Sequence, residues 1–258
     1  MTAAGPLQAA VRRLLDGPVE QLPGAMRVGP PTGDGWMRPG DMLAPRALEG
    51  MMARVARAAG TGDPRVSGTL LLEGYAWSLV APALALHLTE RRVPDIREAV
   101  LRLGPDGYAD GLAYTSPRFA ALSDDPDAGH RHAVALADEG ALLAWLRRGL
   151  VDHLEPIVGA LAPRAGRGRR ALWASVEDCC SDALTWLGDV LGAGDAARAQ
   201  ADLLLGVEAP LHGRARYRAV GTGAGASVVR ERVGCCQSFR RPGHAECPTC
   251  PRARPVGA

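Results

Sequence analysis

The chain has 258 residues, of which 47% are hydrophobic and 22% are charged, so it can bury a substantial core. Its formal net charge of +2 argues against a general nucleic-acid binder. Residues 1–15 lack the basic start, apolar run and cleavage site of a signal peptide, and no apolar stretch is long enough to span a bilayer. We therefore expect a cytoplasmic protein without a membrane span.

Apolar residues at helical spacing predict most of the elements. The predicted helices cover about residues 7–15, 45–59, 67–90, 133–162, 171–191 and 195–206, with a kink or break at Pro82 and two segments within 133–162. Residues 19–42 are rich in Pro and Gly and predict a long loop that carries Trp36. One strand signal stands out, because residues 98–103 and 108–114 flank a turn at 104–107 and so predict a β-hairpin.

These elements predict an α+β fold that is mostly α-helical, with one β-hairpin. Residues 1–210 would form a helical α+β domain. Beyond residue 211 the chain turns Gly- and Arg-rich, and helical periodicity fades. Residues 211–258 would then form a small C-terminal module, which has too few apolar residues to fold without a metal.

Four cysteines in this tail follow the pattern Cys235-Cys236-x10-Cys247-x2-Cys250. Thiols stay reduced in the cytoplasm, so such a cluster indicates metal binding rather than disulfides. Four thiolates are the usual ligands of a [2Fe–2S] cluster. A structural zinc site is the alternative, although zinc favours two Cys-x2–4-Cys knuckles and one half here is a Cys-Cys pair. The spacing favours iron–sulfur and leaves zinc open.

The segment from Arg230 to Pro251 resembles the C-terminal signature of the FhuF-like siderophore-iron reductases. That signature has a Cys-Cys pair, an aromatic-Arg dipeptide, a Pro-Gly turn and a Cys-x2-Cys. The matching residues are Cys235-Cys236, Phe239-Arg240, Pro242-Gly243 and Cys247-x2-Cys250. Val233-Gly234 depart from the pattern, because a small polar and a basic residue are expected before the pair.

The resemblance implies that the four cysteines bind a [2Fe–2S] cluster. It further implies a cytoplasmic oxidoreductase whose cluster passes one electron to Fe(III) in a siderophore, for example a hydroxamate, and releases Fe(II). A ferredoxin or a flavin reductase would supply the electron. Two other functions stay open, a non-enzymatic electron carrier or iron/redox sensor, and a zinc-stapled binding module.

Several further residues are candidates for contact with a substrate or a partner. Arginines near the cysteines could attract an anionic ligand or an acidic ferredoxin, or could belong to a solvated basic tail. The arginines concerned are Arg230, Arg232, Arg240 and Arg241, and Trp36 is the tryptophan expected in a loop. A second vicinal pair, Cys179-Cys180, lies on a predicted apolar helical stripe, where packing is the expected role.

Overall fold

The computed structural model describes residues 5–19, 22, 25–206, 208–213, 216–220, 227–247 and 249–252. The protein is 52% helical and 14% strand, which confirms the predicted mostly α-helical α+β class. The described part contains seven α-helices: α1 (Pro6–Leu15), α2 (Pro39–Met42), α3 (Pro45–Ala58), α4 (Pro64–Glu90), α5 (Glu139–Ala165), α6 (Arg169–Val190) and α7 (Gly194–Leu205).

Helix α4 is the centre of the core. It runs for 27 residues, from the cap at Asp63, whose carboxylate accepts a hydrogen bond from Arg65 N, to a left-handed residue at Arg91. The helix is continuous through Pro82, where a kink or break was predicted, and Pro82 is buried within it. By length and apolar composition α4 could cross a membrane, yet 78% of its most apolar window is buried inside the protein, as in the core helix of a soluble protein.

The strands form three small sheets among the described residues. The first has the order β1-β5-β4-β2, the second β3-β6-β7 and the third β8-β9. Their bounds are β1 (Ala25–Val28), β2 (Trp36–Met37), β3 (Arg92–Pro94), β4 (Val100–Leu103), β5 (Ala109–Tyr114), β6 (Phe119–Leu122), β7 (Ala133–Leu136), β8 (Arg216–Val220) and β9 (Ser227–Glu231).

The predicted hairpin is confirmed as the antiparallel pair β4–β5. The loop predicted over residues 19–42 is wrong in part. Within it, β1 pairs in parallel with β5 and β2 pairs with β4, so that Trp36 lies opposite Arg102. The partners of these short strands lie 86 positions away for β1 and 64 to 66 positions away for β2, and local composition does not reveal such distant pairing.

The helix predicted from Ala133 also begins later in the structure. Residues 133–136 form β7, which pairs in parallel with β6. Helix α5 starts at Glu139, after the Asp138 side chain accepts a hydrogen bond from Ala141 N at 2.8 Å. It then continues as one segment through Pro156 to Ala165.

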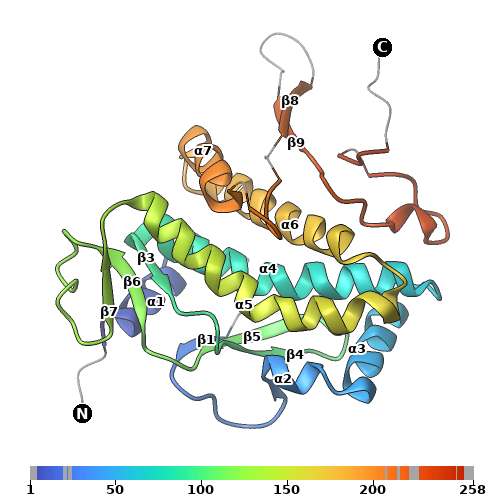
Figure 1. The fold of residues 1–258 in the computed structure, drawn as a ribbon, viewed down its shortest axis with the longest axis horizontal. Coiled ribbons are helices and arrows are strands. Elements are labelled where there is room, and N and C mark those ends of the chain that lie inside the picture. The colour runs from blue at the N-terminus through green and yellow to red at the C-terminus, as the bar shows by residue number, and fades with distance from the viewer. Residues whose placement is uncertain are drawn as a thin grey trace.

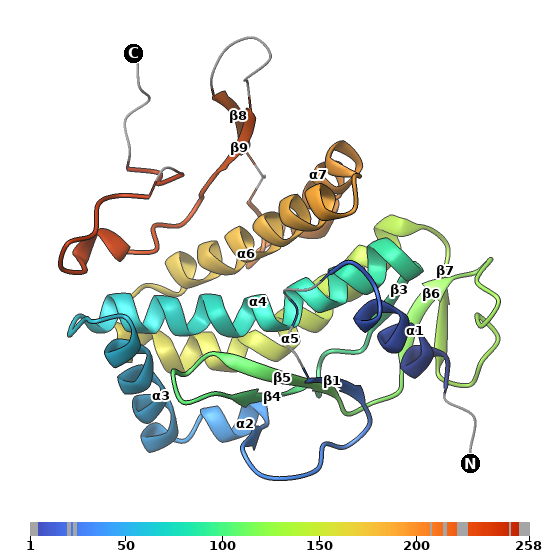
Figure 2. The same cartoon turned by 180° about the vertical axis from the view of Figure 1, so that it is seen from behind.

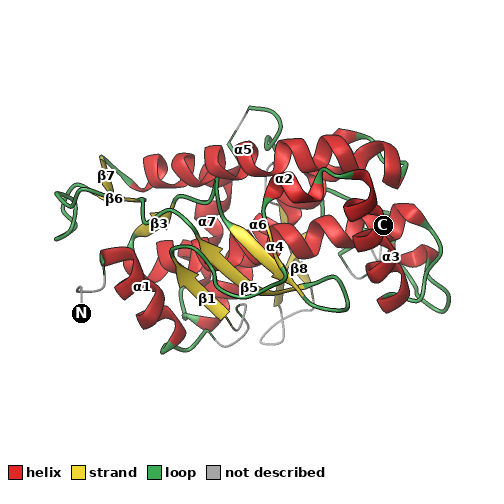
Figure 3. Cartoon of the chain, turned by 90° about the horizontal axis from the view of Figure 1, so that it is seen from below, coloured by secondary structure: helices red, strands yellow, loops and turns green. Residues whose placement is uncertain are grey.

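The elements are arranged in layers (Figures 1 and 2). The sheet β1-β5-β4-β2 lies against one face of the layer formed by α4 and α5, and Figure 3 shows it from below. Helix α6 lies on the opposite side, with α7 packed against it. The β8–β9 hairpin projects beyond α6, and residues 232–252 then turn toward the end of the layer where α4 begins (Figure 1).

Candidate metal centre

The four tail cysteines follow β9, around the 3₁₀ helix η2 (Ser238–Arg240). Cys236 and Cys250 are buried, with 8% and 7% of their surface exposed, whereas Cys235 and Cys247 are half-buried. Cys250 N donates to Cys247 O at 2.9 Å, which closes the turn of the Cys-x2-Cys knuckle. Arg232 N donates to Thr249 O at 3.1 Å and so ties this knuckle to the end of β9.

The thiols of this segment are close enough to influence one another. Burial, and then the neighbouring Cys236 and Cys250, raise the pKa of Cys247 to about 11. Burial also raises the pKa of Cys235, with further increases from Cys250 and Cys236. Four thiolates crowded in this way need a positive charge among them, and a metal centre supplies that charge.

The donor set fits an iron–sulfur cluster, because all four thiols are free and thiolate is the ligand that iron in such clusters prefers. Within the described ranges, no three His, Cys, Asp or Glu side chains are gathered as tightly as a single metal ion requires.

Asp178 of α6 fixes the turn before the cysteine pair. Its carboxylate accepts hydrogen bonds from the backbone N–H groups of Val233 and Gly234, at 2.8 and 2.9 Å. Gly234 packs on the α6 backbone, where an added Cβ would lie 3.1 Å from Ala174 C and Ser175 N. Val233 and Gly234, which depart from the expected pattern before the cysteine pair, are thus held by a side chain 55 residues before Val233.

Arg230 and Arg232 are engaged in buried ion pairs beneath this turn. Arg230 has 5% of its surface exposed and contacts Asp178 at 2.7 Å and Asp182 at 2.6 Å. Arg232 pairs with Glu73 of α4 and lies 3.3 Å from Asp178. Burial raises the pKa of Glu73, and the positive charge of Arg232 partly offsets this increase. This geometry favours an anchoring role for both arginines over contact with a partner.

Arg240 and Arg241 tie the other side of the segment to α3 and α4. Arg240 forms an ion pair with Asp63, the residue that caps α4. Arg241 Nε donates to Ala59 O at 2.8 Å, at the end of α3. Together with the Arg232–Glu73 pair, these contacts fasten the cysteine segment to two helices, α3 and α4.

The remaining predicted residues lie elsewhere. Cys179 and Cys180 are buried in α6, where burial raises the pKa of both thiols, and Cys179 Sγ contacts Glu73 O at 3.5 Å. Trp36 lies on β2 of the first sheet, and Figures 1 and 2 show β1, β5 and β4 of this sheet across the helical layer from the cysteine segment. The structure therefore does not bring Trp36 together with the cysteines.

Sequence analysis did not identify three residues that surround the segment. They are Glu73, Asp178 and Arg167, whose Nη2 donates to Cys235 O at 3.1 Å. A carboxylate within an apolar helical stripe was the available signal for Glu73 and Asp178, because such groups are seldom buried without a partner. Arg167 gave no signal, since it belongs to a run of arginines.

Two family descriptions match the chain. Residues 69–218 are similar to the family described as ferric iron reductase FhuF-like transporter, and residues 232–252 to the FhuF 2Fe-2S C-terminal domain. No protein with a curated description matches. The second match resolves the choice between metals that the cysteine spacing left open, and the cofactor is a [2Fe–2S] cluster rather than zinc.

Proposed function

Because the chain belongs to the FhuF-like ferric iron reductase family, we propose that it is a cytoplasmic ferric-siderophore reductase whose cluster is held by Cys235, Cys236, Cys247 and Cys250. The family supports an oxidoreductase. That its substrate is a ferric siderophore is our proposal. The observation that carries it is the cysteine segment itself, four free thiols on a turn fastened to α6 by Asp178.

The bound cluster supplies single-electron chemistry. The protein's part is to hold the ligands and leave one side accessible. Cys236 and Cys250 face the interior, whereas Cys235 and Cys247 are half-buried. Substrate and electron donor would therefore approach on the side of Cys235 and Cys247.

The substrate is Fe(III) in an oxygen cage. Such a cage binds the small, highly charged ferric ion tightly. Adding one electron gives Fe(II), which is larger and less charged, so that hard oxygen ligands hold it more weakly. Each turnover consumes one electron, which a ferredoxin or flavin reductase would supply, and yields Fe(II) and the free siderophore.

Tyr108, at the tip of the β4–β5 hairpin, is a further candidate for substrate contact. Its ring packs on Gly74 of α4, where an added Cβ would lie 2.7 Å from Tyr108 Cδ1. Burial raises the pKa of Tyr108, and the nearby Arg241 opposes the shift. With 37% of its surface exposed, Tyr108 gives a siderophore a flat surface beside the module.

The division of the chain is part of this proposal. Residues 1–210 would form the helical domain that receives the siderophore, and residues 211–258 the cluster module. The two separate family matches, over residues 69–218 and 232–252, support a chain of two parts. A cytoplasmic location agrees with the burial of α4 and with a reductant-dependent reaction.

The proposal is tested with anaerobically purified protein. The visible spectrum is recorded after reduction and again after a ferric hydroxamate is added, while a ferrous-specific chelator reports Fe(II). We expect the reduced spectrum to return to the oxidised form, with one Fe(II) released per electron. A reduced cluster that ferric hydroxamates and catecholates leave unchanged would make the protein an electron carrier or a sensor.

Matched variants test the ligands. Cys247→Ser and Cys250→Ser should bleach the visible absorption, whereas Cys179→Ala and Cys180→Ala should keep it. Iron and acid-labile sulfide should be present at about two each per chain in the parent protein. Bleaching by Cys179→Ala would show that the proposed ligand set is wrong.

A further inference from the structure

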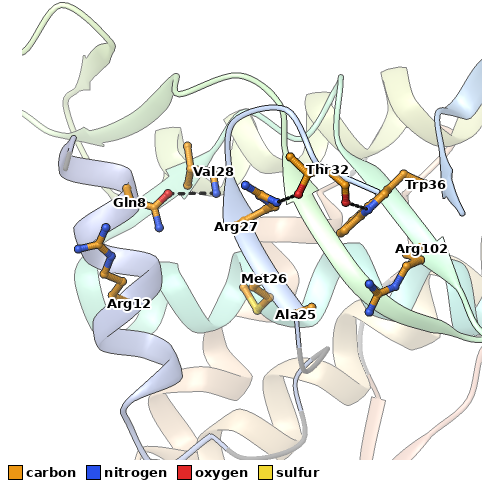
Figure 4. Close-up of a pocket in the computed structure, with 9 residues that line it drawn as sticks. All are labelled: Gln8, Arg12, Ala25, Met26, Arg27, Val28, Thr32, Trp36 and Arg102. Carbon is orange, nitrogen blue, oxygen red and sulfur yellow. Dashed lines mark hydrogen bonds between the residues drawn. The ribbon is translucent and has the colours of Figure 1, made fainter. Parts of the chain in front are cut away.

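A cavity of about 450 Å³ lies between α1 and the first sheet, beneath the loop that joins β1 to β2 (Figure 4). Its volume is in the range of small-molecule sites in proteins. Gln8 and Arg12 contribute from α1, Arg27 from β1, Trp36 from β2 and Arg102 from β4. The cavity thus joins these four elements of the N-terminal half of the chain, and Thr32 of the loop completes its lining.

The charge of the cavity is not balanced. Three arginines line it, and none of its lining residues is acidic. Arg102 is paired with Asp110 at 2.7 Å. Arg12 and Arg27, by contrast, have no carboxylate partner among the residues that the structure describes.

Arg27 carries the clearest sign of a missing partner. Its Nη1 donates to Thr32 Oγ1 at 3.2 Å, while its Nε is buried and has no hydrogen-bond acceptor within the described part of the chain. A buried donor without an acceptor is unfavourable. An anion in the cavity would neutralise the charge of this guanidinium group.

The opposite wall of the cavity is aromatic and rigid. Trp36 Nε1 donates to Thr32 O at 3.2 Å, and the indole packs so closely on Gly111 of β5 that a Cβ there would lie 3.0 Å from the ring. Arg102 lies over the same ring, 5.4 Å from its centroid. This arrangement fixes the plane of the indole beside the guanidinium groups.

From these observations we propose that the cavity binds a small organic anion, with a carboxylate or phosphate on the guanidinium groups of Arg12 and Arg27 and a flat apolar body against Trp36. Guanidinium groups match both oxyanions through paired, charge-assisted hydrogen bonds. The indole supplies apolar contact area for a ring.

The site is separate from the cluster module. The first sheet and the cysteine segment lie on opposite sides of the helical layer (Figures 1 and 2). The inference therefore goes beyond the reductase function and does not depend on it. A bound anion would act by bridging α1 and β1, whose hydrogen bond within the cavity is the one from Val28 N to Gln8 Oε1 at 3.3 Å.

The test uses the full-length holoprotein, calorimetry and three matched probes, 2-naphthoate, 2-naphthyl phosphate and the neutral 2-naphthol. We expect at least one anion to bind and to raise the melting temperature, and the naphthol to bind at least tenfold more weakly. The anion that binds more tightly shows whether the site prefers a carboxylate or a phosphate group. Failure of both anions to bind, or equal binding of the naphthol, would overturn the proposal.

Variants then locate the binding. Arg27→Gln and Arg12→Gln should each weaken anion binding at least about tenfold, the value of a lost charge-assisted hydrogen bond. Arg57→Gln, at an exposed position in α3, is the matched control and should bind as the parent does. Arg12 is exposed, so its variant keeps the test valid if Arg27→Gln unfolds. Equal affinity in all three variants would place the anion elsewhere.

Discussion

Glu177 and Asp178, neighbours in α6, accept backbone hydrogen bonds from opposite sides of the β8–β9 hairpin. Glu177 Oε1 accepts hydrogen bonds from the backbone N–H groups of His212 and Gly213, at 3.0 and 3.1 Å, just before β8. Asp178 receives those of Val233 and Gly234, just after β9. Both carboxylates are buried, so one point of α6 holds the chain where it enters and where it leaves the hairpin.

Replacing Asp178 should therefore release the cysteine pair. In Asp178→Asn, the neutral amide cannot accept hydrogen bonds from two backbone N–H groups and two arginines at once. The change also breaks a buried ion pair, which costs about 3–5 kcal/mol. We expect the cluster content, measured as visible absorbance per chain, to fall by at least about half. Asp182→Asn is the control, because Asp182 contacts Arg230 and is 42% exposed. Full absorbance in Asp178→Asn would contradict the prediction.

Gly234 should tolerate no side chain. In Gly234→Ala the new Cβ meets the α6 backbone at 3.1 Å, and overpacking of this kind costs about 1–3 kcal/mol. The added methyl group would push the turn away from α6 and displace Cys235. Electron paramagnetic resonance of the reduced protein should show a shifted or broadened signal. Gly62→Ala, where nothing lies within 4 Å, should leave the signal unchanged; identical spectra for both variants would count against the packing argument.

Arg240 and Arg241 are predicted to anchor the module rather than to dock a partner. Arg240→Gln/Arg241→Gln removes the contacts with Asp63 and Ala59, so hydrogen exchange at residues 238–241 should accelerate. Arg148→Gln, at an exposed position in α5, should leave that exchange unchanged. If the double variant instead keeps its exchange protection and loses electron-transfer rate only at low salt, the arginines dock a partner.

We expect the protein to lose stability in mild acid because the buried ring of His153 resists protonation. Burial lowers the pKa of His153 to about 4, and the ring is held between Tyr75 Oη at 2.8 Å and Ile96 O at 2.9 Å. The unfolded pKa is about 6.5, so the neutral ring stabilises the fold above that pH. This contribution, about 3 kcal/mol, is lost as the pH falls from 6.5 toward 4. Urea unfolding of His153→Gln should show a shallower pH dependence there, and a slope equal to the parent's would refute the assignment.

The helices could be predicted because each carries its own signal. In α3 the buried residues Leu48, Met51, Met52 and Val55 recur at helical spacing. Strands β1 and β2 lacked such a signal, because they are four and two residues long and depend on β5 and β4 for hydrogen bonds. Pro82 was expected to kink or break α4, but the helix continues through it and Pro82 is buried.

In the candidate site, too, features with a local sequence signal could be predicted, whereas features that depend on distant residues could not. The four cysteines lie within 16 residues, so their spacing was readable from the sequence. Asp178 and Glu73 are 57 and 162 residues before Cys235, and only the packing of α4 on α6 brings both beneath the turn. The arginines were readable as charges, but which of them would be buried was not, since burial depends on carboxylates contributed by other helices.

The position of the acceptors on α6 also sets an order of events during biosynthesis. Residues 232–252 leave the ribosome after α4 and α6, so a helical domain that folds as a unit during synthesis presents Glu73, Glu177 and Asp178 before the cysteines emerge. The nascent tail then meets a prepared surface that aligns the Cys235-Cys236 turn before iron and sulfide arrive. Cluster delivery becomes the last step of maturation, and a chain whose helical layer has not formed gives the delivery machinery no ordered thiols to load.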